Sequence, residues 1–137
     1  MILCPLEPVG PFAVHVRPWL AAACARPGCD LTVEDLFGSC ARGEAQLVGI
    51  FDDGRMIAAG VMQARDYADG VRSCWVLAVG GSGAWAWRHT LREIEAGALR
   101  LGCATVEFVG RPGWARLLPD YAAEPCEAGT HYAKRLG

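Results

Sequence analysis

The fold of this chain is decided by residues 71–109, VRSCWVLAVGGSGAWAWRHTLREIEAGALRLGCATVEFV. The apolar run over 71–79 predicts a buried strand, and glycines follow it at once. Apolar residues then recur at steps of four, three, four and three, which predicts an amphipathic helix that stops at Gly102: Trp87, Leu91, Ile94, Ala98 and Leu101. A second apolar run, over 104–109, predicts another strand. Strand, helix and strand form a β-α-β unit, which requires parallel neighbouring strands and a right-handed crossover.

The sequence before this unit predicts two helices and an antiparallel meander. Residues 13–26 favour a helix, in which Pro18 indicates either a kink or the true start. Thr32 is a predicted N-cap of a short second helix. Strands are then expected over 45–51, 56–67 and 71–79, joined by tight turns at Asp53-Gly54 and Asp69-Gly70.

After residue 109, a short helix is expected over 114–118 and a final strand over 131–136. The whole order predicts one α/β domain over residues 1–137. Its central sheet is mixed, an antiparallel meander followed by β-α-β, and helices cover both faces.

Composition excludes several classes of function. The formal net charge is −2 and no basic stripe is visible, so nucleic acid is not an expected partner. No apolar run is long enough to cross a bilayer, and the first residues lack the pattern of a secretory signal, so we expect no membrane association and a cytoplasmic location. The seven cysteines include no CxxC pair, so we expect no metal and interpret them as small buried residues.

The turn between the predicted strand and helix is rich in glycine. Backbone N–H groups of residues 79–83, VGGSG, could point outward at the start of the helix and hold a phosphate. Three glycines are also what a tight turn needs, so on this segment alone the structural alternative stays open.

The ordered set of elements resembles the GNAT superfamily of acyl-CoA-dependent N-acetyltransferases over residues 12–136. Residues 78–83 overlay the pyrophosphate-binding pattern of that family, with Gly81 and Gly83 on its glycines and Ala78 in place of Gln or Arg. Residues 101–108 are similar to the entry into its fifth strand, and residues 131–136 to its last strand. Residues 110–116 and 118–121 look like those of compact GNAT-like proteins from bacteriophages and prophages.

The resemblance implies an acetyl-CoA site and an amine substrate. The implied acetyl-CoA contacts are at the following residues: Leu77, Val79, Gly80, Gly81, Ser82, Gly83 and Ala84. Backbone N–H groups near residues 77–79 would polarise the thioester carbonyl. Arg111 replaces the family's Asn, and the usual acid tyrosine falls on Pro119, which leaves Tyr121 as the nearest substitute.

Glu107, in an otherwise apolar strand, is the best candidate for a general base. The alternative is an ion pair with Arg111 or Arg116. Two functions of different classes follow. One is an acetyl-CoA-dependent N-acetyltransferase of phage or prophage type. The other is a non-catalytic bacteriophage virion protein that keeps the scaffold and contacts phage structural proteins or copies of itself. The first function requires that the two parallel strands separate where the helix begins; if they do not, only the non-catalytic function remains.

Overall fold

The computed structural model describes residues 1–82 and 86–137. Within them lies one mixed sheet of seven strands in the order β1-β2-β3-β4-β5-β7-β6. The strands are β1 Ile2–Leu6, β2 Gln46–Asp52, β3 Arg55–Asp66, β4 Arg72–Gly81, β5 Thr105–Gly110, β6 Ala122–Cys126 and β7 Gly129–Arg135. The helices are α1 Pro11–Cys24, α2 Val33–Ala41, α3 Ala86–Arg100 and the 3-10 helix η1 Pro112–Arg116. Strands β4 and β5 are parallel, as the β-α-β prediction requires.

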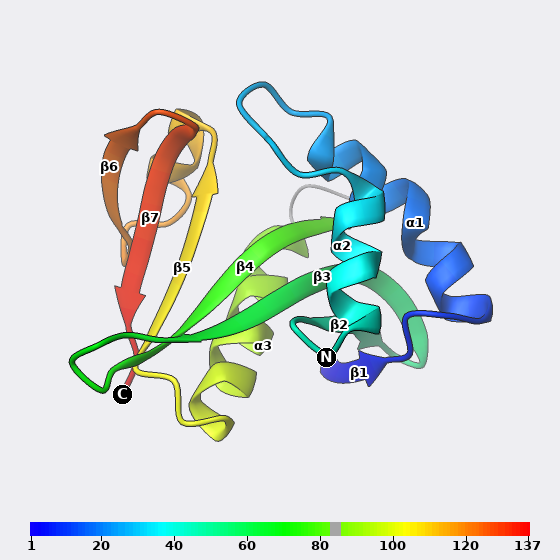
Figure 1. Ribbon diagram of the computed structural model, residues 1–137. Helices are drawn as coiled ribbons and strands as arrows, with labels where there is room; N and C mark the ends of the chain where they lie inside the picture. Colours follow the sequence, from blue (N-terminus) through cyan, green and yellow to red (C-terminus); the bar gives the residue numbers. More distant parts are fainter. Residues whose placement is uncertain (83–85) are drawn as a thin grey trace.

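Helices cover both faces of the sheet, as predicted. Figure 1 shows α1 and α2 in front of the strands and α3 behind them. Two clusters of buried residues correspond to these layers. Val16, Leu20 and Leu36 lie in the cluster on the α1–α2 face, and Leu91 and Ile94 in the cluster on the α3 face.

The first two helices begin for different reasons. Helix α1 starts at Pro11, where the missing N–H of proline has no cost, and continues through Pro18 as one helix. The alternative that the helix starts at Pro18 is therefore wrong. The carbonyl that loses a partner there is that of Val14, which is 73% exposed and can bond to water. Helix α2 begins as predicted, with a capping box between Thr32 and Asp35.

The meander formed by β2, β3 and β4 is also confirmed. Its first turn carries positive φ angles at Asp53 (53°) and Gly54 (75°), the conformation of a tight hairpin. Strand β4 runs further than predicted, to Gly81, so Gly80 and Gly81 belong to the strand and not to the turn. Between Val76 and Ala78 the pairing with β3 shifts by one residue, which makes Leu77 the extra residue of a β-bulge.

Two strands were not predicted, β1 and β6. Each contains a proline (Pro5 and Pro125), and β6 is exposed along its whole length. Proline in an edge strand is ordinary because its missing N–H can face away from the sheet. The short helix expected over 114–118 is the 3-10 helix over 112–116, and the last predicted strand is β7. Among the described helices, none has the length and apolar character needed to cross a membrane.

Candidate functional site

A cleft opens where β4 and β5 stop pairing. The two strands pair only from Ser73 to Trp75 on β4 and from Thr105 to Glu107 on β5, although both strands continue beyond that point. The free space between them is about 160 Å³. Its walls are residues 76–79 of β4 and 108–110 of β5, together with Ala22, Ala23, Arg26, Arg111 and Trp114. The two strands therefore separate beyond Trp75 and Glu107, as the enzyme hypothesis requires.

The bulge at Leu77 lies in this cleft wall. On one side of it, Val76 faces the α3 core; on the other, Ala78 faces the α1 core. A bulge interrupts the hydrogen-bond ladder and re-aims the backbone. With β5 separated from β4 at this level, backbone polar groups of residues 76–79 are available to a molecule in the cleft.

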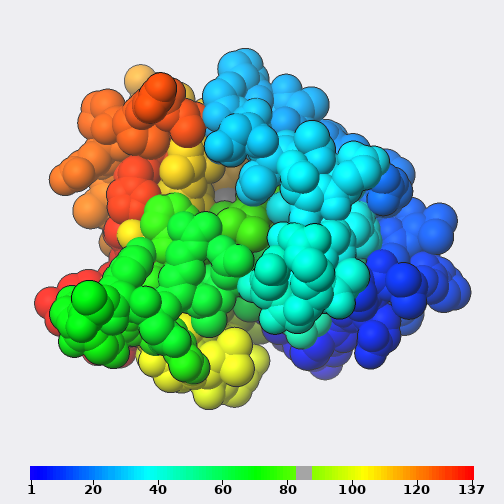
Figure 2. All heavy atoms as spheres, viewed as in Figure 1, coloured from blue at the N-terminus to red at the C-terminus, as the bar shows by residue number. Residues whose placement is uncertain are grey.

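Arg26 connects the two sides of the cleft. It follows α1, and its guanidinium donates to the carbonyl of Val109 on β5 and to that of Ala128 in the β6–β7 turn, both at 3.2 Å. Beside it, a Cβ on Gly28 would lie 2.5 Å from the Ala128 oxygen, so the loop after α1 rests directly on that turn. Figure 2 shows this loop in light blue against the orange β6–β7 end. Arg26 thus fixes the end of α1 to the far wall.

The glycines expected to hold a phosphate have a packing reason to be glycine. A Cβ on Gly80 would lie 2.4 Å from the backbone oxygen of Trp19, and one on Gly81 equally close to that of Ile57. The N–H of Ser82 donates to Ile57 as well, at 3.0 Å. Gly83 and Ala84, the remaining residues of the expected phosphate site, lie outside the described residues.

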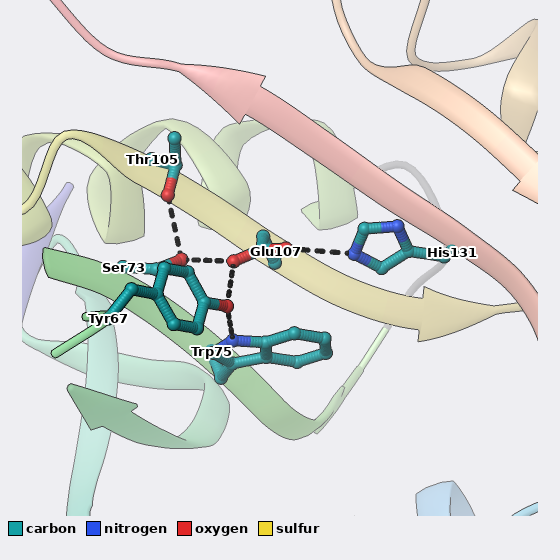
Figure 3. A network of polar contacts seen from close by, with 6 residues as sticks. All are labelled: Tyr67, Ser73, Trp75, Thr105, Glu107 and His131. Carbon is teal, nitrogen blue, oxygen red and sulfur yellow. Dashed lines mark hydrogen bonds and ion pairs between the residues drawn. The ribbon is translucent and has the colours of Figure 1, made fainter. Parts of the chain in front are cut away.

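Glu107 is the centre of a polar network beside the cleft floor (Figure 3). One carboxylate oxygen accepts hydrogen bonds from Ser73 and from Tyr67 (2.7 Å). The other oxygen lies 3.0 Å from Nε2 of His131. The expected ion pair with Arg111 or Arg116 is wrong, because β7 brings His131 to the carboxylate.

The network also fixes the charge of this carboxylate. The Glu107 side chain is only 12% exposed. Burial raises its pKa, but the hydrogen bonds from Ser73, Tyr67 and His131 outweigh burial and hold the pKa below the ordinary value. Glu107 is therefore ionised at neutral pH.

Trp75 contacts both Tyr67 and His131 and so fixes the positions of these two rings. Its indole N–H donates to the Tyr67 hydroxyl at 2.8 Å. The His131 ring stacks on the indole, with centroids 5.5 Å apart and planes 28° from parallel. The Arg65 guanidinium lies 4.6 Å from the indole centroid. Four elements thus hold the imidazole and the carboxylate in one arrangement.

Tyr121 is not part of this network. It is 7% exposed in the core on the α3 face, and its hydroxyl donates to Glu95 at 2.7 Å. Burial, followed by the bond to Glu95 and its negative charge, raises the pKa of Tyr121. Lys134 neutralises the same carboxylate, at 2.9 Å. The structure therefore does not bring the two expected catalytic residues, Glu107 and Tyr121, together.

His131 and Tyr67 were missed by sequence reasoning. Tyr67 ends a hairpin and resembles a solvated turn residue, while His131 is one polar residue in a short C-terminal strand. The available signal was the strand register: Val109 and His131 are partners on β5 and β7, so Glu107 and His131 share a face. In the part of the chain that the structure describes, no three His, Cys, Asp or Glu side chains are grouped to hold a metal ion.

The chain was compared with known proteins by family model, by curated sequence and by structure. No family model matches, and no curated protein matches in sequence. Solved structures do match. An acyl-CoA N-acyltransferase from Pseudomonas aeruginosa has a TM-score of 0.64 at 13% identity, over 100% of both chains.

Two further solved structures are similar to this chain over nearly its whole length. The polyamine N-acetyltransferase of Drosophila melanogaster has a TM-score of 0.67 at 14% identity, over 98% of this chain and 99% of that one. A GNAT family acetyltransferase from Brucella melitensis, in complex with acetyl-CoA, has a TM-score of 0.63 at 14% identity, over 98% and 88%. At such identities the likeness establishes architecture. The chain is an α/β protein with the GNAT fold.

Proposed function

We propose that this protein is an acyl-CoA-dependent N-acyltransferase, which moves an acetyl or similar acyl group from the CoA thioester to an amine. The observation that carries the proposal is the separation of β4 from β5 beside the bulge at Leu77. It leaves an open cleft with backbone groups of a strand along one wall. Acyl transfer from a thioester is favoured by a fixed backbone N–H in the cleft, because that group can stabilise the oxyanion that forms on the thioester carbonyl.

The residues of the cleft fit the extended pantetheine arm of CoA. Its amides can pair with backbone groups near Leu77 and Val79, and the apolar walls suit its methylene groups. Arg111 at the cleft rim carries positive charge, which suits the phosphates of CoA. Gly83 and Ala84, at the start of the segment that leads into α3, remain the proposed pyrophosphate contacts. Gly80, Gly81 and Ser82 serve instead to let β4 lie against Trp19 and Ile57.

The polar network suits an amine acceptor. Glu107 is an ionised carboxylate in a mostly buried place, and it lies at the last register position before the strands separate. Negative charge there attracts an ammonium group to the cleft floor. The Tyr121 hydroxyl could protonate the leaving thiolate only by giving up its bond to Glu95, so we do not assign it that role.

The acceptor and the biological setting are further parts of the proposal. Proteins of similar fold include a polyamine N-acetyltransferase, an agmatine N-acetyltransferase and a ribosomal-protein-alanine N-acetyltransferase. These names suggest a test panel of agmatine, a polyamine and a peptide with an N-terminal alanine. A bacteriophage origin, with a location in the host cytoplasm, stays part of the proposal.

The test is release of CoA from acetyl-CoA with each acceptor. Products should be separated by chromatography, because the seven cysteines of the protein would react with a thiol reagent. We expect CoA release with at least one acceptor, above a control without acceptor, and formation of the acetylated amine. If the protein neither binds nor consumes acetyl-CoA, the proposal is overturned. That result is what the non-catalytic virion alternative predicts.

A further inference from the structure

We propose that His131 accepts the proton of the acceptor amine and that Glu107 is the positioning residue that orients its ring. This inference rests on the proposed function, and it assigns the general base to β7 rather than to the carboxylate that the sequence singled out. Three observations carry it: the ring is held, it lies next to the cleft, and the carboxylate already accepts three hydrogen bonds.

The imidazole is held from two directions. Nε2 lies 3.0 Å from an oxygen of Glu107, and the ring stacks on Trp75. A carboxylate partner at Nε2 selects the tautomer in which Nε2 carries the proton. The other nitrogen, Nδ1, is then a lone-pair acceptor, and it makes no hydrogen bond to the residues that the structure describes. With 30% of the side chain exposed, a substrate can reach the ring.

The imidazole is also beside the cleft. His131 is the register partner of Val109, which lines the cleft wall. Its stacking partner Trp75 directly precedes Val76, the first cleft residue on β4. Figure 3 shows the imidazole of His131 on β7 and the indole of Trp75 on β4, both next to the Glu107 carboxylate. An amine over this group would meet an acyl carbon held near Leu77.

Glu107 is a poor general base because its carboxylate already accepts several hydrogen bonds. Its two oxygens already accept three hydrogen bonds, from Ser73, Tyr67 and His131. Each of these bonds stabilises the ionised form, and proton acceptance would require breaking at least one. The carboxylate therefore serves best as a fixed negative charge that stabilises the imidazolium formed when His131 takes a proton.

The proton balance of the step is simple. The ammonium form of the acceptor gives one proton to Nδ1 of His131, and the resulting amine attacks the thioester carbonyl carbon. The new C–N bond forms, the C–S bond breaks, and CoA leaves as a thiolate. The amide nitrogen loses its second proton as the thiolate gains one. The imidazolium returns its proton to solvent, so the net products are the amide, CoA thiol and one proton.

Several titratable and charged groups surround the imidazole. Glu107 of β5 faces it directly, and Glu124 of β6 is its register partner on the other side. Tyr67 reaches the same carboxylate from the β3–β4 hairpin, and Arg65 of β3 lies on the shared indole. An imidazole that already carries a proton cannot accept the one from the acceptor, so the rate should fall as pH is lowered.

The experiment compares His131→Gln, His131→Ala and Glu107→Gln with wild type, using acetyl-CoA and the most active acceptor of the panel above. His15→Gln is the matched control, since His15 is an exposed histidine on α1 outside the cleft. We expect His131→Gln to lower kcat about 100-fold or more with unchanged acetyl-CoA binding, and to abolish the acidic limb of the pH–rate profile. Glu107→Gln should lower kcat about tenfold and keep that limb.

Chemical rescue separates a chemical role from a structural one. Free imidazole should restore part of the kcat of His131→Ala and should leave His15→Gln unchanged. A His131→Gln enzyme that binds acetyl-CoA and keeps the wild-type kcat and acidic limb would overturn this inference and leave the proposed function intact. Absence of CoA release from wild type would overturn the proposed function, and the assignment of His131 with it.

Discussion

Replacing Gly80 by alanine tests whether the glycines at the end of β4 serve packing. A Cβ at this position would lie 2.4 Å from the backbone oxygen of Trp19 and 2.8 Å from its carbonyl carbon, whereas ordinary contacts begin near 3.4 Å. Both obstacles are backbone atoms, so no rotamer change relieves the clash, and α1 must move away from β4 by about 1 Å.

The expected loss follows from this displacement. Overpacking costs about 1–3 kcal/mol, and the upper end applies because the clash is with helix backbone. Removing a glycine from the unfolded chain returns roughly 0.4–1 kcal/mol. The net loss of unfolding free energy is about 2 kcal/mol, which lowers Tm by roughly 8 °C in a domain of this size.

Thermal unfolding followed by circular dichroism, without any ligand, measures the shift. Gly97→Ala is the matched control, because the nearest atoms to its Cβ lie at 3.8 Å and it sits inside helix α3. That variant should gain about 1 kcal/mol. A Gly80→Ala protein that melts at or above the wild-type temperature would refute the packing explanation and restore the alternative that this glycine is kept for a phosphate.

Three further substitutions test the Thr32 cap of α2, the hydrogen-bond network of Glu107 and the hydrogen bonds that Arg26 makes across the cleft. Thr32→Ala should lower the free energy of unfolding by about 1 kcal/mol in urea, since the capping box of α2 is lost; no change would mean that water replaces it. In Glu107→Gln, the stability difference from wild type should be present near pH 7 and should shrink as pH falls through the lowered pKa of Glu107, because the native state favours the ionised form; a difference independent of pH in urea titrations would contradict this. Arg26→Ala should cost about 1–3 kcal/mol, because the carbonyls of Val109 and Ala128 across the cleft lose a charged donor; an unchanged urea midpoint would show that these hydrogen bonds contribute nothing to stability.

The sequence predicted what depends on local patterns. Helix α3 followed from the spacing of apolar residues, α2 from the Thr32 cap, and the first hairpin from Asp53-Gly54. Each of these is decided within a few residues, where propensity and burial agree. The parallel pairing of β4 with β5 followed as well, because a strand-helix-strand order leaves no other short connection.

What escaped prediction depends on contacts between distant segments. The extension of β4 through Gly80 is stabilised by the approach of α1, which a turn-rich sequence does not reveal. The partner of Glu107 was misjudged because arginines nearby in sequence were favoured over His131, which is close only through strand pairing. The continuous helix through Pro18 depended on the exposure of Val14, which is a property of the folded surface.

The central claim is that an acyl-CoA enters the space between β4 and β5, and calorimetric titration with acetyl-CoA tests it most directly. Ala22 is an exposed α1 residue that lines the cleft, and its neighbour Ala21 is exposed but does not line it. Tryptophan at position 22 should fill the cleft, while tryptophan at position 21 should leave it open. We predict that wild type and Ala21→Trp bind acetyl-CoA with the same Kd and that Ala22→Trp binds at least about tenfold more weakly, a loss of roughly 1.4 kcal/mol. Equal binding by both variants, or no binding by the wild-type protein, would contradict the account.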